Sequence, residues 1–168
     1  MTTYEYIPGT PELLEQIWQA DVERQPAANK PLWLRWKSQF LADHAAGRTR
    51  SYLVLADGKP VGQGTLVFDP ACEQIRGELR LADGEQVANV NALRIASAYE
   101  GQGHISALMK RMEEDAVEAG YSELTIGVEP REIRNRMIYE HWGYAEHVLT
   151  RLEEGQQVLY YRKRIGPG

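Results

Sequence analysis

Residues 93–105 read LRIASAYEGQGHI, an apolar stretch followed by two closely spaced glycines. A β-strand is predicted before the glycines, over Val87 to Ala96, and an amphipathic helix is predicted after Gly103. Glycine lets the backbone come close to a bulky anion. The first amides of a helix have no partner within the helix, and the helix dipole favours negative charge beside them. The segment therefore predicts a turn that binds phosphate, for which a pyrophosphate is a natural ligand.

Two other interpretations of these glycines remain open from the pattern alone. Two glycines before a helix also form ordinary tight turns. A dinucleotide-binding fingerprint needs a third glycine where Ser106 stands, and it usually opens a βαβ unit early in the chain. Here the turn follows three or four strands that look antiparallel, which argues against that fingerprint.

The rest of the chain predicts alternating groups of strands and helices. Asp57-Gly58 is a strong hairpin signal, and Thr10-Pro11 is typical of a helix start. Strands are predicted at 4–7, 51–56, 60–68, 87–96, 124–128, 145–152 and 157–164. Helices are predicted to begin at Pro11, at Pro31, after Gly103 and at Pro130. The order β-αα-ββ-β-α-β-α-ββ predicts a single α+β domain over residues 1–168.

Apolar spacing predicts which faces of the later helices are buried. In the helix after Gly103, the buried face is expected to hold Ile105, Leu108, Met109, Met112 and Ala116. In the helix after Pro130, the buried side is expected to hold Ile133, Met137 and Ile138. Residues 69–81 are polar and predict no regular element.

Composition limits the classes of function. The chain has 168 residues and a net charge of −5, which argues against nucleic acid as the main partner. Cys72 is the only cysteine, so no internal disulfide is expected, and the residue is expected in a loop or the core. No signal peptide is predicted at the first residues, and no apolar run approaches the roughly 20 residues of a membrane span. We therefore expect a cytoplasmic protein that has no membrane partner.

Residues 93–103 resemble motif A of the GNAT acetyltransferases, in which an apolar strand and a Tyr precede Arg/Gln-x-x-Gly-x-Gly/Ala. Residues 128–144, VEPREIRNRMIYEHWGY, resemble a later stretch of the same family, Val-x-Pro to Leu-Tyr-x-x-x-Gly-Phe. The hairpin at Asp57-Gly58 resembles the family's second and third strands. The resemblance implies the GNAT acyl-CoA N-acyltransferase fold, a mixed and mostly antiparallel central sheet with helices on both faces.

The resemblance also implies a function. It implies an N-acetyltransferase that moves the acetyl group of acetyl-CoA, a co-substrate, to a primary amine of a small-molecule or peptide acceptor. No spacing of His, Cys, Asp or Glu in the sequence suggests a metal, so none is expected. The resemblance allows a homodimer. Acetyl-CoA would lie between the strands Val87–Ala96 and Leu124–Val128, with its pyrophosphate on the glycine turn. The residues expected to bind it are Leu93, Ile95, Glu100, Gly101, Gln102, Gly103, His104, Ile105, Ser106, Asn135 and Tyr139.

The sequence departs from the family pattern at several of these positions. Glu100 stands where Arg or Gln is usual, and Ile105 stands where Gly or Ala is usual. Ser97 replaces a common Pro. Glu132 replaces an Asn that often contacts the pantetheine arm, and Asn135, one turn later, is expected to substitute for it. These departures keep open an alternative function, a non-catalytic CoA-binding or sensor domain of the same fold.

Three residues are expected to carry the chemistry. The resemblance makes Tyr139 the general acid, although its helical spacing also suits a core aromatic. Regular alternation would put Asn89 and Asn91 on one strand face with Leu93 and Ile95. Asn89 or Asn91 could then hold a water that acts as base, and Asn91 is the catalytic candidate of the two.

Glu129 is an alternative base or a solvated carboxylate at the start of a helix. A β-bulge near Ile95 would supply an amide for the oxyanion. The acceptor pocket is expected among aromatic residues of the first two helices and the last hairpin, namely Trp18, Trp33, Trp36, Tyr160 and Tyr161. Glu129 or Glu146 could attract a cationic amine.

Overall fold

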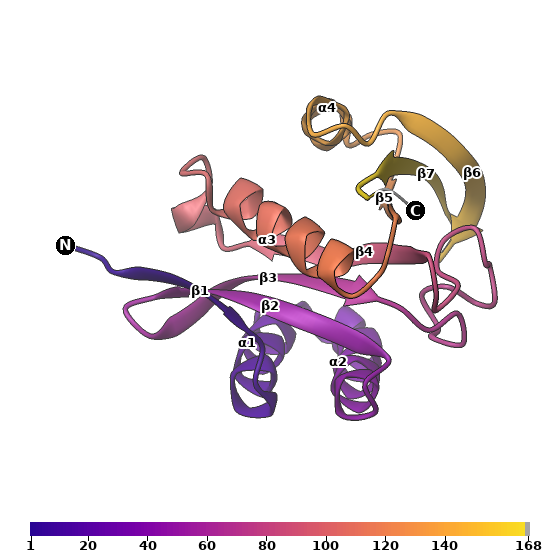
Figure 1. Cartoon of the computed structure of the whole chain (residues 1–168). Coiled ribbons are helices and arrows are strands. Elements are labelled where there is room, and N and C mark those ends of the chain that lie inside the picture. Colours follow the sequence, from indigo (N-terminus) through magenta and orange to yellow (C-terminus); the bar gives the residue numbers. More distant parts are fainter. Residues whose placement is uncertain (167–168) are drawn as a thin grey trace. The chain divides into compact units, whose positions relative to one another are not determined.

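The helices and strands of the computed structural model follow the predicted order (Figure 1). The structure describes residues 1–166. The strands are β1 (Tyr4–Pro8), β2 (Thr49–Ala56), β3 (Lys59–Val67), β4 (Val87–Ile95), β5 (Glu123–Val128), β6 (Glu146–Glu153) and β7 (Gln156–Arg164). The helices are α1 (Pro11–Arg24), α2 (Lys30–Ala45), α3 (His104–Glu118) and α4 (Ile133–His141), with short 3-10 turns at Ala27–Asn29 and Ser97–Tyr99.

The strands form one sheet in the order β1-β2-β3-β4-β5-β7-β6. β4 pairs with β5 in parallel, whereas β5 with β7 and β6 with β7 are antiparallel. This mixed and mostly antiparallel sheet, with helices on both faces, confirms the predicted fold class. The chain divides into two compact units: unit 1 is Met1–Thr65 with Ala92–Met112, and unit 2 is Leu66–Asn91 with Glu113–Gly168.

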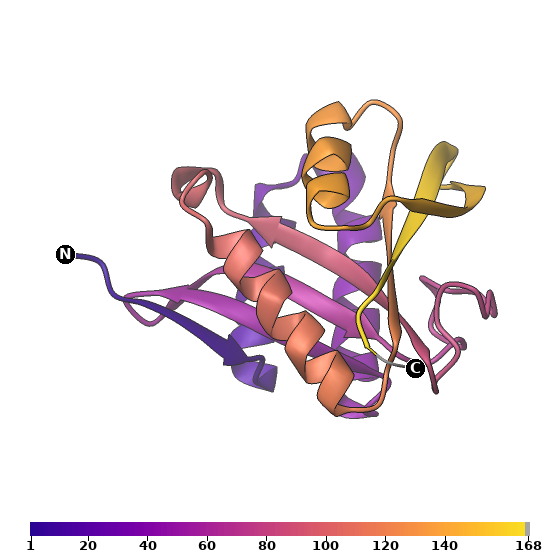
Figure 2. The ribbon, with the colours of Figure 1, turned by 45° about the horizontal axis from the view of Figure 1, so that its top comes forward.

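In unit 1, helices cover both faces of the strands (Figures 1 and 2). α1 and α2 cover one face, and the first turns of α3 cover the other. The first face buries one apolar cluster, which comprises Leu14, Ile17, Trp18, Phe40, Leu53 and Leu55. On the other face, a Cβ at Gly64 would lie 2.7 Å from the sulfur of Met112 and 3.1 Å from Leu93. The lack of a side chain at Gly64 therefore allows α3 to lie close against β3.

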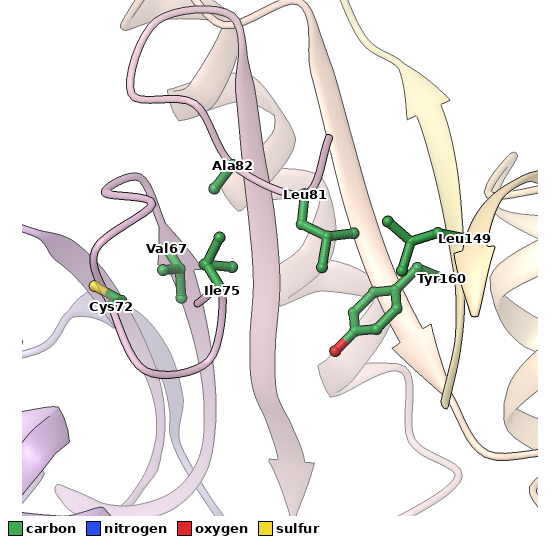
Figure 3. Close-up of a cluster of buried hydrophobic side chains, with 7 residues drawn as sticks. All are labelled: Val67, Cys72, Ile75, Leu81, Ala82, Leu149 and Tyr160. Carbon is green, nitrogen blue, oxygen red and sulfur yellow. The ribbon is translucent and has the colours of Figure 1, made fainter. Parts of the chain in front are cut away.

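In unit 2, the polar segment 69–86 folds as a series of turns that covers an apolar cluster (Figure 3). The cluster comprises Val67, Cys72, Ile75, Leu81, Ala82, Leu149 and Tyr160. The Arg151 guanidinium on β6 donates to the carbonyl of Ile75 at 2.8 Å and to that of Gln74. Cys72 is thus a core residue, one of the two places expected for it.

Helix α4 differs from its prediction. It begins at Ile133, three residues after Pro130, because a turn precedes it. In that turn the amide of Glu132 donates to the carbonyl of Glu129 at 2.9 Å, and a Glu132 carboxylate oxygen accepts from the Glu129 amide at 2.8 Å.

The predicted buried side of α4 is wrong for two of its three residues. Ile133 is 67% exposed and Met137 is 66% exposed. At about 100° of rotation per residue, Ile138 and Tyr139 lie opposite Ile133 and Met137 on this short helix. Ile138 and Tyr139 are half-buried, and Ile133 and Met137 on the opposite side face solvent.

The predicted buried face of α3 is confirmed. Leu108, Met109, Met112 and Ala116 are buried, and Ile105 is half-buried.

In residues 1–166, no helix combines the length and apolar character needed to cross a membrane.

Candidate functional site

The glycine turn leaves backbone amides available at the start of α3. Gly101 and Gly103 have φ of 75° and 85°, in the left-handed region that favours glycine. A Cβ built on either glycine would have no neighbour within 4 Å. The first helical bond of α3 runs from the amide of Ala107 to the carbonyl of Gly103 at 3.0 Å. The amides of residues 104–106 precede that bond, so the turn offers open space beside unpaired donors, as an anion site requires.

Two of the residues that depart from the family pattern, Glu100 and Ile105, belong to this turn and the start of α3. Glu100 is exposed, so water can solvate its carboxylate, and Ile105 is half-buried. His104 is only 6% exposed, because its ring packs against β1. Its centroid lies 4.3 Å from that of Tyr4 and 6.0 Å from that of Tyr6.

Sequence reasoning missed the two β1 tyrosines beside the turn. The hydroxyl of Tyr6 lies 2.8 Å from His104 Nδ1, and the hydroxyl of Tyr4 donates to Gln102 Oε1 at 3.2 Å. His104 Nε2 lies 3.2 Å from the same oxygen. The spacing of Tyr4 and Tyr6 is the period of a strand face, but it does not identify a partner 98 residues away.

Strand β4 is irregular in the middle. Ala92 has φ of 51°, a left-handed residue of the kind found in β-bulges. The irregularity expected near Ile95 is thus three residues earlier. Leu93 and Ile95 contact the glycine face of β3, whereas Arg94 points to the α1 side and binds Asp21. The expectation that regular alternation runs from Asn89 to Ile95 is wrong, because Ala92 interrupts it.

Asn89 and Asn91 have different environments. Asn89 is 1% exposed, and its Nδ2 donates to the side-chain oxygen of Thr125 at 3.0 Å. The Thr125 hydroxyl in turn donates to the carbonyl of Leu81 at 2.8 Å. Asn89 is therefore a structural residue that ties β4 to β5.

Asn91 is half-buried, and its Nδ2 lies 3.5 Å from Asn89 Oδ1, a long contact. The paired register of β4 and β5 ends at Val90 and Ile126, one residue before Asn91. Of the two amides, Asn91 is thus the one that can hold a water.

Tyr139 is half-buried on α4 and lies beside Trp142, with 5.8 Å between ring centroids. Burial, and to a smaller extent the nearby charge of the Glu132 carboxylate, raise the pKa of its phenol to about 12. The side chain is therefore a neutral hydroxyl, able to donate a hydrogen bond, throughout the neutral pH range.

Two other candidate site residues, Glu129 and Asn135, have hydrogen-bond partners in or next to the turn before α4. One Glu129 oxygen accepts from Arg131 at 3.0 Å, and Glu132 accepts from the Asn135 side-chain amide at 3.1 Å. The Glu129 carboxylate thus already has a cationic partner. Asn135 keeps its carbonyl oxygen and one N–H for another group.

The proposed acceptor aromatics are mostly core residues. Trp18 and Tyr160 belong to the two buried clusters, and Tyr160 also donates to Glu153. Tyr161 is buried under His147 and Arg136, while Trp33 and Trp36 are half-buried. Glu146 is bound by Arg162 at 2.6 Å.

Over residues 1–166, no group of three or more His, Cys, Asp or Glu has an arrangement that could hold a metal.

The sequence model of the acetyltransferase (GNAT) family matches residues 10–144 of this chain. This chain belongs to the GNAT family. No curated protein matches it.

Solved GNAT structures resemble the chain over nearly its whole length. Arabidopsis thaliana NAA60 in complex with a bisubstrate analogue has a TM-score of 0.71 at 17% identity, covering 99% of each chain. The same protein in complex with acetyl-CoA has a TM-score of 0.71 at 15% identity, covering 97% of this chain and 99% of that one. The ribosomal-protein-alanine N-acetyltransferase of Brucella melitensis has a TM-score of 0.69 at 18% identity, covering 95% and 99%. At these identities the similarity shows the GNAT fold.

Proposed function

We propose that this GNAT chain is an acetyl-CoA-dependent N-acetyltransferase whose acceptor is a primary amine of a small molecule or a peptide. The observation that carries the proposal is the turn before α3, with its two left-handed glycines and the unpaired amides of residues 104–106. The solved relatives support the donor, since NAA60 has been seen with acetyl-CoA. They also make a protein N-terminus a reasonable acceptor, since one relative is named as an acetyltransferase of a ribosomal-protein alanine.

Backbone groups would supply most of the donor site. The pyrophosphate would accept from the amides of Gly101 to Ser106, and the pantetheine arm would pair with the backbone of Leu93 to Ile95. Asn135 would contact the arm through the polar groups that Glu132 leaves unused. Because these contacts are mainly with backbone, Glu100 and Ile105 need not resemble the usual family residues.

The chemistry would be direct transfer. The amine nitrogen attacks the thioester carbon, the C–N bond forms, the C–S bond breaks, and the sulfur leaves with the electron pair. Tyr139 would donate a hydrogen bond to that sulfur. With a pKa of about 12, against about 8.5 for a simple thiol, complete proton transfer from Tyr139 is uphill. Hydrogen bonding to the developing thiolate is therefore its larger contribution.

Two further groups would complete the reaction. A backbone amide next to the irregularity at Ala92 would hold the oxyanion, since preorganised amides need no reorganisation during the reaction. A water held by Asn91 would accept the proton that the amine loses. The amine must be neutral when it attacks, so we expect turnover to rise with pH below the pKa of the acceptor.

Binding of acetyl-CoA gives the first test. A ligand that binds only the native state adds about 2.7 kcal/mol at a hundredfold excess over its dissociation constant. We expect a clear rise in melting temperature with acetyl-CoA, and release of CoA thiol when a suitable amine is added. No melting shift at millimolar acetyl-CoA would contradict the proposal and favour a plain interaction module.

A non-catalytic CoA-binding or sensor domain is the second candidate. It is favoured by strand β4, where one candidate amide, Asn89, is structural and the other, Asn91, cannot itself act as a base. Both candidates bind CoA, so thermal shift does not separate them. Thiol release with a panel of amino acids, polyamines, aminoglycosides and N-terminal peptides does, since a sensor releases none.

A further inference from the structure

A closed set of hydrogen bonds joins β1 to the first residues of α3. Gln102 Oε1 can only accept, so His104 Nε2, 3.2 Å away, must be the donor of that pair. His104 Nδ1 is then an acceptor, and the Tyr6 hydroxyl donates to it at 2.8 Å. Both ring nitrogens are satisfied when His104 is neutral.

Tyr6 is held to α3 through its backbone as well. Arg111, two turns along α3, donates from Nη1 to the carbonyl of Tyr6 at 2.7 Å. The Tyr4 hydroxyl also donates to Gln102 Oε1 at 3.2 Å, so this oxygen accepts from both Tyr4 and His104. The side chains of Gln102 and His104 are therefore bonded to β1 or to each other.

We propose that Tyr6, acting through His104, is a positioning residue that fixes the glycine turn in the conformation that receives the CoA pyrophosphate. Holding a residue in a single backbone conformation costs conformational entropy, and two glycines make this turn costly to order. A turn ordered in advance does not incur that cost when the ligand binds. The proposal rests on the proposed function, because it assumes that the turn binds CoA.

The test compares CoA with pantetheine, which lacks the pyrophosphate and the nucleotide. Tyr6→Phe removes one hydroxyl and keeps the ring. We expect its dissociation constant for CoA to rise about fivefold, the loss of one ordinary hydrogen bond, while that for pantetheine stays unchanged. Isothermal titration calorimetry measures both constants. An equal weakening for both ligands, or for neither, would overturn the proposal.

Variants of His104 provide the matched controls. His104→Asn keeps an acceptor near the position of Nδ1, whereas His104→Leu keeps the volume and removes both polar atoms. We expect Asn to retain most of the CoA affinity that Leu loses. Adding Tyr6→Phe to His104→Leu should weaken CoA binding no further, because the hydrogen bond between Tyr6 and His104 is already absent in the single variant. Additive losses would mean that Tyr6 acts independently of His104, and the proposal would fail.

The failure of the broader function would look different. If the wild-type protein bound CoA no more tightly than pantetheine, the turn would not be a pyrophosphate site, and the proposed donor site would be wrong. If the wild-type protein preferred CoA strongly and Tyr6→Phe kept the full preference, only the role of Tyr6 would be wrong. A melting curve for each variant shows whether it is folded.

Discussion

The glycine turn of unit 1 and helix α4 of unit 2 use their polar groups in opposite ways. In the turn, the side chains of Gln102 and His104 are bonded to β1 or to each other, and the backbone amides at the helix start are unpaired. At α4, the amides of Glu129 and Glu132 are bonded within the turn, and the pKa of Tyr139 is raised by burial and charge without a hydrogen bond. The glycine turn thus has backbone amides that a ligand could bind, whereas α4 has the side-chain hydroxyl of Tyr139.

Under the proposed function, this difference predicts which substitutions each region would tolerate. A site made of backbone amides depends on conformation, so Glu100 and Ile105 can replace the residues usual in the family as long as the glycines keep their left-handed φ. A site made of one hydroxyl depends on that hydroxyl. Changes in the turn should therefore act on donor binding, and changes on α4 should act on turnover.

The largest effect is expected for Tyr139→Phe. Its hydroxyl has little to bind in the ground state, since a thioester sulfur is a weak acceptor, and its bond strengthens as charge develops on sulfur. General-acid help is worth about 10²–10⁴-fold, and we expect the lower end because the phenol pKa of about 12 lies far above that of a thiol. Single-turnover kinetics should show kcat about a hundredfold lower with unchanged acetyl-CoA affinity. Wild-type turnover in this variant would return Tyr139 to a core aromatic.

The next effect is expected for Gly103→Val. A β-branched residue resists the left-handed conformation and places bulk where phosphate oxygens would approach. We expect CoA affinity to fall about tenfold or more, the loss of one or two charge-assisted hydrogen bonds. Gly155→Val is a matched control, because Gly155 has a φ of 76° and equally open surroundings in the β6–β7 hairpin. It should lose similar stability and keep its CoA affinity. Equal CoA binding by both variants would place the pyrophosphate elsewhere.

Asn89 and Asn91 provide a paired test of structure against catalysis. Asn89→Ala leaves Thr125 without a buried donor and should lower the free energy of unfolding by about 1–3 kcal/mol, with little change in kcat. Asn91→Ala should lower kcat a few-fold and leave stability nearly unchanged. Chemical denaturation and steady-state kinetics separate the two. Glu129→Gln should do little, and a collapse of activity in that variant alone would identify Glu129 as the base.

Local signals in the sequence predicted most of the fold, and long-range contacts account for what they missed. Asp57-Gly58 and Gly101-Gln102-Gly103 mark their turns by local chemistry, so the element order could be predicted. The fold of residues 69–86 could not, because it depends on Arg151 reaching the carbonyls of Ile75 and Gln74 from β6.

The candidate site shows the same division. The glycine turn could be named from its local pattern, whereas Tyr139 could be named from the resemblance of residues 128–144 to the family, and the roles of both stay predictions. The contact between Tyr6 and His104 joins residues 98 positions apart, and an alanine in the left-handed region at Ala92 has no sequence signature. The structure also gives Asn89 and Asn91 different environments, whereas regular strand alternation alone would place both on the same face.

The smallest effect, and the sharpest test of the α4 environment, is expected for Glu132→Gln. Burial is the main cause of the raised Tyr139 pKa, and the Glu132 charge is the second. Removing a negative charge makes the phenolate less unfavourable, so the pKa should fall below about 12, yet burial should keep it above the ordinary value of about 10. The Gln oxygen can still accept from the Glu129 amide, so the turn before α4 should survive.

The pKa of Tyr139 in this variant can be followed by NMR titration with tyrosine labelled at Cζ. The Tyr139 signal is the one that disappears in Tyr139→Phe. Glu140→Gln is the control, because Glu140 is an exposed carboxylate on the same helix and does not contribute to the shift. Turnover at pH 7 should stay at the wild-type level, since the phenol is protonated in every variant at that pH. An unchanged Tyr139 pKa in Glu132→Gln would show that burial alone raises it, and that the carboxylate before α4 has no electrostatic part in keeping the acid protonated.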